Sequence, residues 1–397
     1  MAGHKRRWPA PLRFIVCLGL VSLFADMTYE GARSVIGPFL QNLGASAALV
    51  GLIAGFGEML AASLRLFSGR LADRTRAYWT ITFLGYALTL VAVPLLAFAG
   101  NWQLAALLVI AERTGKSLRG PARDVLLSGA TDAVGHGFGF GLHTALDQTG
   151  AVLGPLFVAA AVARSHRFGP AFLWLAVPGV AALAALVAAR ALNPGETVAA
   201  QPARASQPLP RVFWIYAAAA GLLACGFVDF PLLAYHFQKT ALVQPTVIPV
   251  VYAGAMGMNG LAALLFGRLF DRYGIRTLTY GIAASLLAPP LGFLGGPAAA
   301  IAGVACWAAG LGAQDACLRA GIAQVVSMNK RGGAFGAFNA VYGVMWFLGS
   351  AAMGLLYDHS VTALVVFGVA AQSAAATMFL RLRKPLEAAR AANSSPA

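Results

Sequence analysis

Charge is scarce in this chain. Only 11% of its 397 residues are Asp, Glu, Lys or Arg, whereas soluble proteins average about 25%. Residues 77–111 and 277–314 hold no charged residue at all, and each segment exceeds the ~20 apolar residues that cross a bilayer as a helix. The apolar runs are continuous rather than alternating, which excludes a β-barrel. The sequence therefore predicts an all-α polytopic membrane protein.

Cysteine is scarce as well. All four cysteines (Cys17, Cys225, Cys306 and Cys317) lie inside apolar segments, without metal-ligand spacing or a disulfide framework. No nucleotide-binding loop and no nucleophile–base arrangement stands out. We therefore expect no cofactor, no metal and no enzymatic activity.

Turn-rich and charged breaks divide the apolar sequence into twelve spans. The N-terminal "HKRR" leads into a first span that is too long for a signal peptide and has no cleavage site. The predicted spans are residues 13–40, 46–68, 77–99, 102–122, 138–163, 168–190, 212–238, 245–266, 277–295, 298–326, 335–357 and 361–381.

The net charge of +15 is placed asymmetrically. If both termini are cytoplasmic, most Lys and Arg fall in tails and cytoplasmic loops, and the external loops keep only Arg164, Arg167 and Lys239. This asymmetry follows the positive-inside rule, so the basic residues report topology and do not indicate a nucleic-acid partner.

Short strings recur in the two halves of the chain. "GRLADRTRA" at residues 69–77 matches "GRLFDRYGI" at residues 267–275. Weaker landmarks repeat at similar offsets: "FAD" and "FVD" ending at Asp26 and Asp229, "LR" ending at Arg119 and Arg319, and "LG" ending at Gly154 and Gly349. We infer an internal duplication of six spans. The predicted units are an N-terminal bundle (1–192), a cytoplasmic linker (193–211), a C-terminal bundle (212–384) and a cytoplasmic tail (385–397).

Charges inside the membrane follow a pattern. The third span of each group of three carries none, so we expect spans 3, 6, 9 and 12 to face lipid and the others to surround a polar interior. The interior charged groups of the first half are Asp26, Glu30, Arg33, Glu58, Arg65, Glu112, Arg113, Lys116, Arg119 and Asp147, with His143 beside them.

Four of these acids, Asp26, Glu58, Glu112 and Asp147, are predicted to lie at one depth near the midplane. Two interpretations remain open. They form structural ion pairs with Arg33, Arg65 and Arg113, or they carry protons during transport.

The repeated string resembles the loop signature of the major facilitator superfamily, and the resemblance covers the whole chain. The first copy keeps Gly69, Asp73 and Arg74 but has Arg76 where the family has Gly, and the second copy has Gly267, Asp271 and Arg272. The resemblance implies two pseudo-symmetric six-helix bundles, alternating access, and gating roles for these loop residues. It also implies a bacterial inner membrane location.

The fifth span is similar to the motif of proton-coupled antiporters in that superfamily. Its landmarks are Gly141, Gly150, Gly154 and Pro155. A face of small residues for close helix packing explains the same pattern without a functional role.

These observations favour a proton-coupled exporter of a small organic molecule, acting as a monomer in the lipid bilayer. Proton coupling is assigned to the first half and substrate contact mainly to the second. The substrate-contact residues are predicted to be Asp229, Tyr235, His236, Asn259, Gln314, Asp315, Arg319, Asn339, Tyr342 and Trp346.

Two alternatives remain open. Arg33, Arg65, Arg113, Lys116 and Arg119 suit a proton symporter or exchanger for an anionic metabolite. A non-transporting membrane receptor or scaffold belongs to a different class, and it would not need carboxylates at the midplane.

Overall fold

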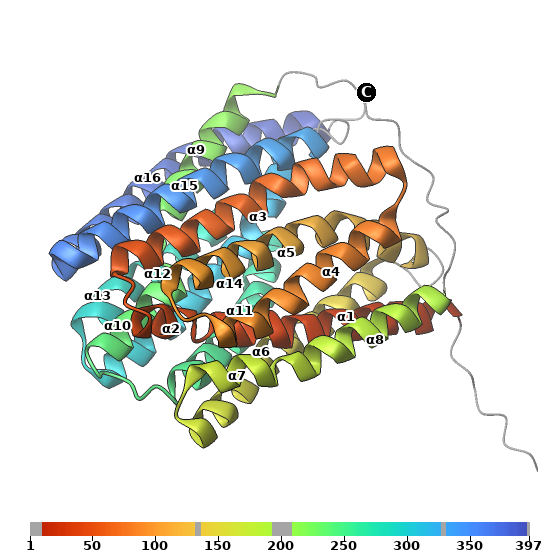
Figure 1. The fold of residues 1–397 in the computed structure, drawn as a ribbon. Helices are drawn as coiled ribbons and strands as arrows, with labels where there is room; N and C mark the ends of the chain where they lie inside the picture. The colour runs from red at the N-terminus through yellow and green to blue at the C-terminus, as the bar shows by residue number, and fades with distance from the viewer. Residues whose placement is uncertain (1–9, 132–135, 193–208, 327–330, 395–397) are drawn as a thin grey trace, which may run out of the picture.

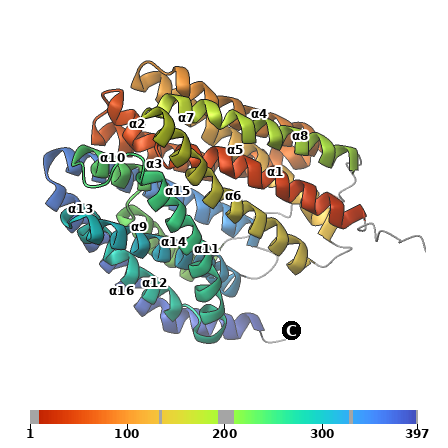
Figure 2. The same ribbon diagram turned by 90° about the horizontal axis from the view of Figure 1, so that it is seen from below.

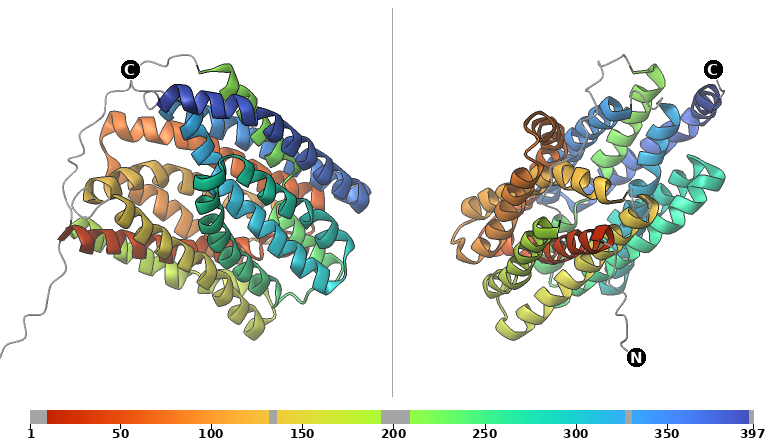
Figure 3. Two further views of the ribbon diagram at one scale, coloured as in Figure 1. Left: turned by 180° about the vertical axis from the view of Figure 1, so that it is seen from behind. Right: turned by 90° about the vertical axis from the view of Figure 1, so that its right-hand side faces the viewer.

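The structure is a computed structural model that describes residues 10–131, 136–192, 209–326 and 331–394. Long helices run side by side along the molecule (Figure 1). The first turn of α1 and the last turns of α16 lie at one end, here called the terminal end (Figures 1 and 3). The short helices α2, α10 and α13 lie at the other, here called the distal end. Most of the predicted linker lies outside the described residues.

The twelve predicted spans all correspond to helices, some divided in two. In chain order the elements are α1 (Ala10–Arg33), α2 (Ile36–Asn42), α3 (Ala47–Thr75), α4 (Tyr78–Leu95), η1 (Leu96–Phe98), α5 (Trp102–Thr131), α6 (His136–Ser165), α7 (Phe168–Trp174), α8 (Ala176–Leu192), α9 (Arg211–Gly226), α10 (Phe230–Lys239), α11 (Ile248–Tyr273), α12 (Arg276–Leu286), α13 (Ala288–Leu294), α14 (Pro297–Val325), α15 (Arg331–His359) and α16 (Val361–Ser394).

Eleven of the twelve are long and apolar enough to cross a membrane, counted over the described residues. The one that does not qualify is α5, which carries Glu112, Arg113, Lys116 and Arg119. Its polar face therefore has to lie against other helices rather than lipid. Several helices also run past the predicted span ends, and α16 continues to Ser394.

Four spans are divided into two helices, namely spans 1, 6, 7 and 9, and spans 1 and 7 lie in the interior. Span 1 breaks between α1 and α2, and span 7 breaks at Phe227–Asp229 before Pro231 in the first turn of α10. The Val228 carbonyl accepts a hydrogen bond from Trp307 Nε1 at 2.8 Å, which satisfies a backbone group freed by the break. The sequence did not predict these breaks, because the apolar residues run through them.

The two halves repeat one helix crossing. A Cβ on Gly154 of α6 would lie 2.3 Å from the Met27 carbonyl oxygen of α1, and a Cβ on Gly349 of α15 would lie 2.0 Å from the Cys225 carbonyl oxygen of α9. The "LG" landmarks are therefore equivalent positions. The "FAD" and "FVD" landmarks are not equivalent. Asp26 lies one position before Met27, where α1 is crossed, whereas Asp229 lies four positions after Cys225, where α9 is crossed.

The third helices of each group are peripheral, as predicted. The spans formed by α4, α7–α8, α12–α13 and α16 pack mainly within their own halves. They present large apolar side chains to the outside, among them Leu84, Val180, Leu294 and Val366.

The halves meet mainly along α3 with α15, α6 with α11 and α2 with α10 (Figure 2), and α3 also contacts α10. The contact is tightest at the distal end. A Cβ on Gly37 of α2 would lie 1.9 Å from the Pro231 carbonyl oxygen of α10. Asp358 of α15 accepts hydrogen bonds from the first backbone amides of α3, with Ala48 N at 2.9 Å. The distal end is therefore closed.

The repeated charged strings are helical rather than loops, which corrects the sequence prediction. Residues 69–75 form the last turns of α3, and the chain turns at Arg76 in the left-handed conformation with φ 55°. Gly274 ends α11 at the equivalent position with φ 64° but with a different ψ of −147°. Arg76 thus adopts the left-handed conformation, which costs a residue with a side chain about 1 kcal/mol, and the two copies end their helices with different turns.

Replacing Gly154 with Ala should destabilise the fold, because the new methyl group meets the backbone of α1, which cannot rotate away. We expect a loss of about 1–3 kcal/mol, as for other overpacked sites. Gly141→Ala on the same helix is the matched control, since nothing lies within 4 Å of that position. Thermal unfolding of the purified variants tests this, and an equal midpoint for both would contradict the tight crossing.

Candidate functional site

Charged residues of α1 and α5 pair in register along the interior of the first half. Asp26 Oδ1 lies 3.8 Å from Arg119 Nη2, and Glu30 Oε1 lies 3.9 Å from Lys116 Nζ. The spacing of i, i+4 and i+7 puts Asp26, Glu30 and Arg33 on one face of α1. We call these pairs, with the Arg33–Glu58–Arg113 group described next, the charge ladder.

The third group of the ladder is shared by three helices. Glu58 Oε1 of α3 lies 3.0 Å from Arg33 Nη2 and 3.3 Å from Arg113 Nη1. The Glu58 side chain is 26% exposed, so solvent reaches the group. Asp26 lies about 10 Å further along α1 than Arg33. Glu58 is thus held by Arg33 and Arg113, whereas Asp26 faces Arg119.

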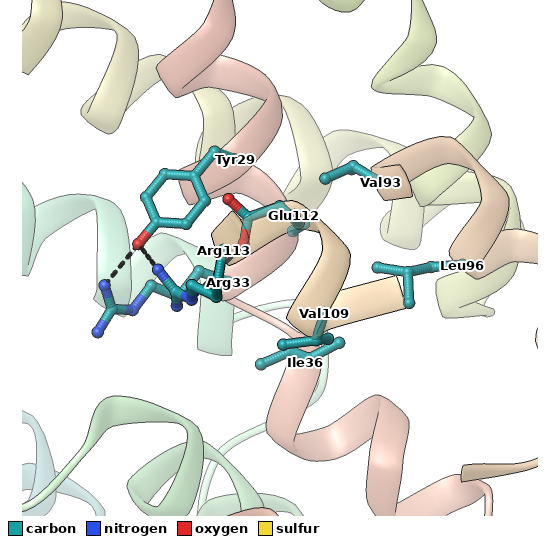
Figure 4. A pocket seen from close by; sticks show the side chains of 9 residues that line it. Tyr29, Arg33, Ile36, Val93, Leu96, Val109, Glu112 and Arg113 are labelled. Atoms are coloured by element: carbon teal, nitrogen blue, oxygen red, sulfur yellow. Dashed lines mark hydrogen bonds and ion pairs between the residues drawn. The ribbon is translucent and has the colours of Figure 1, made fainter. Parts of the chain in front are cut away.

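Tyr29 lies among the cations of the ladder. Its hydroxyl accepts hydrogen bonds from Arg33, at 2.8 Å, and from Arg113 (Figure 4). Lys116 Nζ lies 3.5 Å from the centre of its ring, a geometry that stabilises the cation against burial. The sequence analysis missed Tyr29, although its position next to Glu30 was an available signal.

A small pocket lies beside these groups, between α1, α2, α4 with η1, and α5. Glu112 and Arg113 form its polar wall, and Val93, Leu96 and Val109 line the rest (Figure 4). Glu112 Oε2 lies 3.5 Å from Arg113 Nε, and its Oε1 has no hydrogen-bond partner among the described residues. Glu112 thus meets one arginine and Glu58 meets two, although Oε1 of each carboxylate lacks a hydrogen bond with the described residues.

The ladder also reaches the second half of the protein. Arg33 Nη2 lies 3.9 Å from Asp229 Oδ1, at the break in span 7. Asp229 Oδ2 accepts hydrogen bonds from Ser350 Oγ at 2.5 Å and Trp346 Nε1 at 3.0 Å. Tyr252 of α11 donates to Glu30 Oε2 at 2.6 Å. Because both links cross between the halves, a change in the ladder's charge acts on their contact.

A second polar group lies nearer the terminal end. Ser22 Oγ lies 3.0 Å from His143 Nε2 and accepts a hydrogen bond from Arg123 at 3.1 Å. Asp147, one turn from His143, makes no hydrogen bond or ion pair with the described residues, but it is close enough to Asp26 for the two charges to repel. Of the four predicted acids, Asp26 and Asp147 are thus the least firmly paired.

Polar residues of the second half continue the interior surface. Asn259 lies 3.4 Å from Gln148 of the first half and donates to Asp315 at 3.3 Å. Tyr342 donates to Gln314 at 2.9 Å. Asn339 is half-buried on the same helix as Tyr342.

Two predicted substrate residues lie elsewhere. Tyr235 and His236 belong to α10 at the distal end, where His236 Nδ1 lies 2.9 Å from the Tyr357 hydroxyl. His236 also stacks near Phe293, with ring centres 5.0 Å apart. These residues pack the closed end of the molecule, so their assignment to the central cavity is corrected.

Arg65 does not pair with Glu58, contrary to the ion-pair interpretation. Arg65 and Arg319 are both exposed, and neither makes an ion pair within the described parts of the chain. Asp315, one turn from Arg319, is exposed too. Interior residues that lie toward the terminal end are therefore accessible to solvent.

The predicted gating residues lie at the terminal ends of α3 and α11. Asp73 accepts a hydrogen bond from Tyr78 at 3.2 Å. Neither Asp73 nor Asp271 makes an ion pair with a described residue, and both are exposed. In this conformation the two acids do not tie the halves together.

Comparison with known proteins identifies relatives along the whole chain. Residues 18–350 match the family described as Major Facilitator Superfamily. Uncharacterized proteins of Mycobacterium tuberculosis and Mycobacterium bovis are 41% identical over 392 residues, which is 96% of each chain. An uncharacterized MFS-type transporter of Methanocaldococcus jannaschii is 29% identical over 140 residues, 35% of each chain.

Solved structures share the fold at low sequence identity. The nucleoside transporter NupG has a TM-score of 0.74 with 14% identity, over 95% of this chain and 99% of its own. The peptide transporter POT has a TM-score of 0.73 with 14% identity, over 94% of both chains. A bacterial homologue of the lysosomal transporter Spinster, in an inward-facing and unoccupied conformation, has a TM-score of 0.66 with 14% identity, over 98% and 100%.

Glu58→Gln should destabilise the protein more than Glu112→Gln. The first change leaves Arg33 and Arg113 without their shared counterion, with an expected loss of up to about 3 kcal/mol. The second removes one contact at 3.5 Å. Denaturant or thermal unfolding in detergent measures both, and a larger effect at Glu112 would show that the ladder does not depend on Glu58.

Proposed function

We propose that this chain, which belongs to the major facilitator superfamily, is a secondary transporter that exports a small organic molecule in exchange for protons. The similar solved structures include a nucleoside transporter and a peptide transporter. At 14% identity they support the fold and not the substrate. The interior of this chain itself supports transport, as follows.

The observation that carries the proposal is the difference between the two ends. At the distal end, Gly37 meets Pro231 and Asp358 caps α3. Toward the terminal end, Arg65, Asp315 and Arg319 are exposed on interior helices. A polar interior that is closed at one end and accessible from the other is one end state of alternating access.

The distribution of basic residues supports the proposed orientation. With both termini cytoplasmic, the basic loops lie inside and the distal end faces outward. The structure is then inward-facing, the conformation in which the Spinster homologue was solved. In this state the substrate enters from the cytoplasm, as an exporter requires.

Proton coupling is assigned to Asp26 and Asp147, with Glu58 and Glu112 in supporting roles. Asp26 and Asp147 repel each other, so a proton on either carboxyl group removes the repulsion. Arg119 lies 3.8 Å from Asp26, too far for a hydrogen bond. Glu58, by contrast, holds two arginines and suits permanent pairing.

Proton-driven uptake of an anion is the second candidate, favoured by the unpaired Arg65 and Arg319. It uses the same fold and acids but the opposite direction of substrate flow. A library screen in inverted vesicles distinguishes the two. An exporter that exchanges substrate for protons makes the vesicle interior less acidic when its substrate is added. A symporter running in reverse would not show this antiport response, and no response to any compound would contradict proton-coupled transport.

Asp26→Asn and Asp147→Asn should each abolish gradient-driven transport of a compound found in that screen. Exchange of the compound without a proton gradient should remain within about twofold of the wild type, because the coupling step alone is lost. Asp124→Asn is the matched control, since Asp124 is exposed and bonded to its neighbour Arg123. If both variants still move the compound against its gradient, the proton site lies elsewhere.

Gly37→Ala should weaken closure of the distal end. The added methyl group would overlap the Pro231 backbone, so the halves have to part there and the outward-facing state gains population. Gly100→Ala is the control, because nothing lies within 4 Å of Gly100. Labelling of a cysteine introduced at Gln238 should speed up severalfold in the Gly37 variant only. Equal labelling rates would contradict the role of this contact.

A further inference from the structure

The cations of the interior fall into two classes. Arg33, Arg113, Lys116 and Arg119 belong to the charge ladder and face carboxylates. Arg123 pairs with Asp124 at 2.9 Å. Arg65 and Arg319 have no such partner among the described residues, and both are exposed. An interior cation without a counterion, held open to solvent, is a candidate ligand for a mobile anion.

Arg65 and Arg319 come from opposite halves, and each lies on a helix that contacts α15. A Cβ on Gly343 of α15 would lie 2.8 Å from the Ala62 Cβ of α3, and Arg65 is one turn beyond Ala62 toward the terminal end. On its other side, α15 touches α14 through Tyr342 and Gln314 at 2.9 Å. Arg319 is just over one turn beyond Gln314. Asn339 on α15 is one turn from Gly343 and Tyr342, in the direction of the terminal end.

The charges of the two arginines act on each other. Among the charged groups that act on Arg65, Arg319 is the strongest, ahead of Glu58 on Arg65's own helix. Two like charges so placed push α3 and α14 apart. The nearest acid on α14 is Asp315, which attracts Arg319 without forming an ion pair and accepts a hydrogen bond from Asn259, so two arginines face one carboxylate and the net charge stays positive. The space between the halves at this level therefore attracts anions.

We propose that Arg65 and Arg319 together bind the anionic group, a carboxylate or phosphate, of the transported substrate, with Asn339 contributing its amide. This inference rests on the proposed transport function and names its substrate class. Each guanidinium presents paired N–H donors that match the two oxygens of such a group. Because each half supplies one arginine, an anion that binds both arginines connects the two halves.

The arrangement also explains why an empty carrier would stay open. Without an anion, repulsion between Arg65 and Arg319 opposes closure of the terminal end. An anion between them replaces repulsion with two attractions, so the loaded carrier closes more readily than the empty one. Closure that depends on the substrate prevents transport cycles that would dissipate the proton gradient.

Anion-dependent thermal stability of the full-length protein in detergent tests the site. The probes are inorganic phosphate and malonate at equal ionic strength, with choline chloride as the reference. A ligand that binds only the folded state raises the unfolding midpoint with concentration. We expect a dose-dependent rise for the wild type, and its loss in Arg65→Gln and in Arg319→Gln. Arg65→Lys should keep only part of it, since Lys lacks the planar fork.

Arg268→Gln is the matched control, because Arg268 is an exposed arginine on α11 outside this group. It should keep the full response. The double variant Arg65→Gln/Arg319→Gln should lose the anion response to the same extent as either single variant, because both arginines belong to one site. An unchanged response in both single variants, or none in the wild type, would overturn the proposal.

A lipid headgroup could present the same chemistry. The measurement is therefore repeated in detergent with added phosphatidylglycerol. A response to this lipid and to neither free anion would assign the arginines to lipid binding and overturn the substrate site. Either failure leaves the vesicle pH assay for transport unaffected, so the two proposals are tested separately.

Discussion

The carboxylate of Glu58 is the contact on which the interior depends. It neutralises Arg33 and Arg113 at once, so three helices of the first half meet at a single group. Placing charges at this depth costs at least about 2.5–3.5 kcal/mol each unless they are paired. With Glu58 in place, Arg33 is free to reach Asp229 in the other half. The Glu58 carboxylate thus stabilises the first half and also affects the charge of Arg33 that Asp229 of the second half meets.

The link between the halves combines rigid and polar contacts. At the distal end, glycines on α2 and α3 let backbones approach closely, and such contacts depend on shape and not on protonation. Nearer the middle, Arg33–Asp229 and Tyr252–Glu30 depend on charge. At the terminal end, Arg65 and Arg319 repel. This gradient, from close packing to repulsion, explains why the halves part at one end and why a proton or an anion can shift them.

The sequence predicted the fold well because its signals are local. Length, apolar runs and the absence of charge in every third span locate helices and their lipid-facing members without knowledge of packing. The duplicated string located the ends of α3 and α11, although it forms helix turns and not loops. The breaks in spans 1 and 7 were missed, since Trp307 stabilises one of them from a distant helix.

The sequence predicted which residues belong to the site but not which of them contact each other. The acids and arginines were identified, but their partners depend on helix register, which spacing along one chain cannot give. Asp26 therefore faces Arg119, which its own helix could not predict, and Tyr235 and His236 lie at the distal end because they belong to the last turns of span 7. Tyr29 was missed because an aromatic residue in an apolar helix is most often packing.

The central claim is that the polar interior of the protein opens alternately at the terminal end and at the distal end. Distances between paired spin labels test it directly, with one pair at Thr75 and Tyr273 at the terminal end and another at Gly100 and Gly296 at the distal end. All four positions are exposed. The account predicts that changing the pH from about 8 to about 5 in liposomes lengthens one distance while shortening the other. Two distances that stay fixed, or that lengthen together, would contradict alternating access.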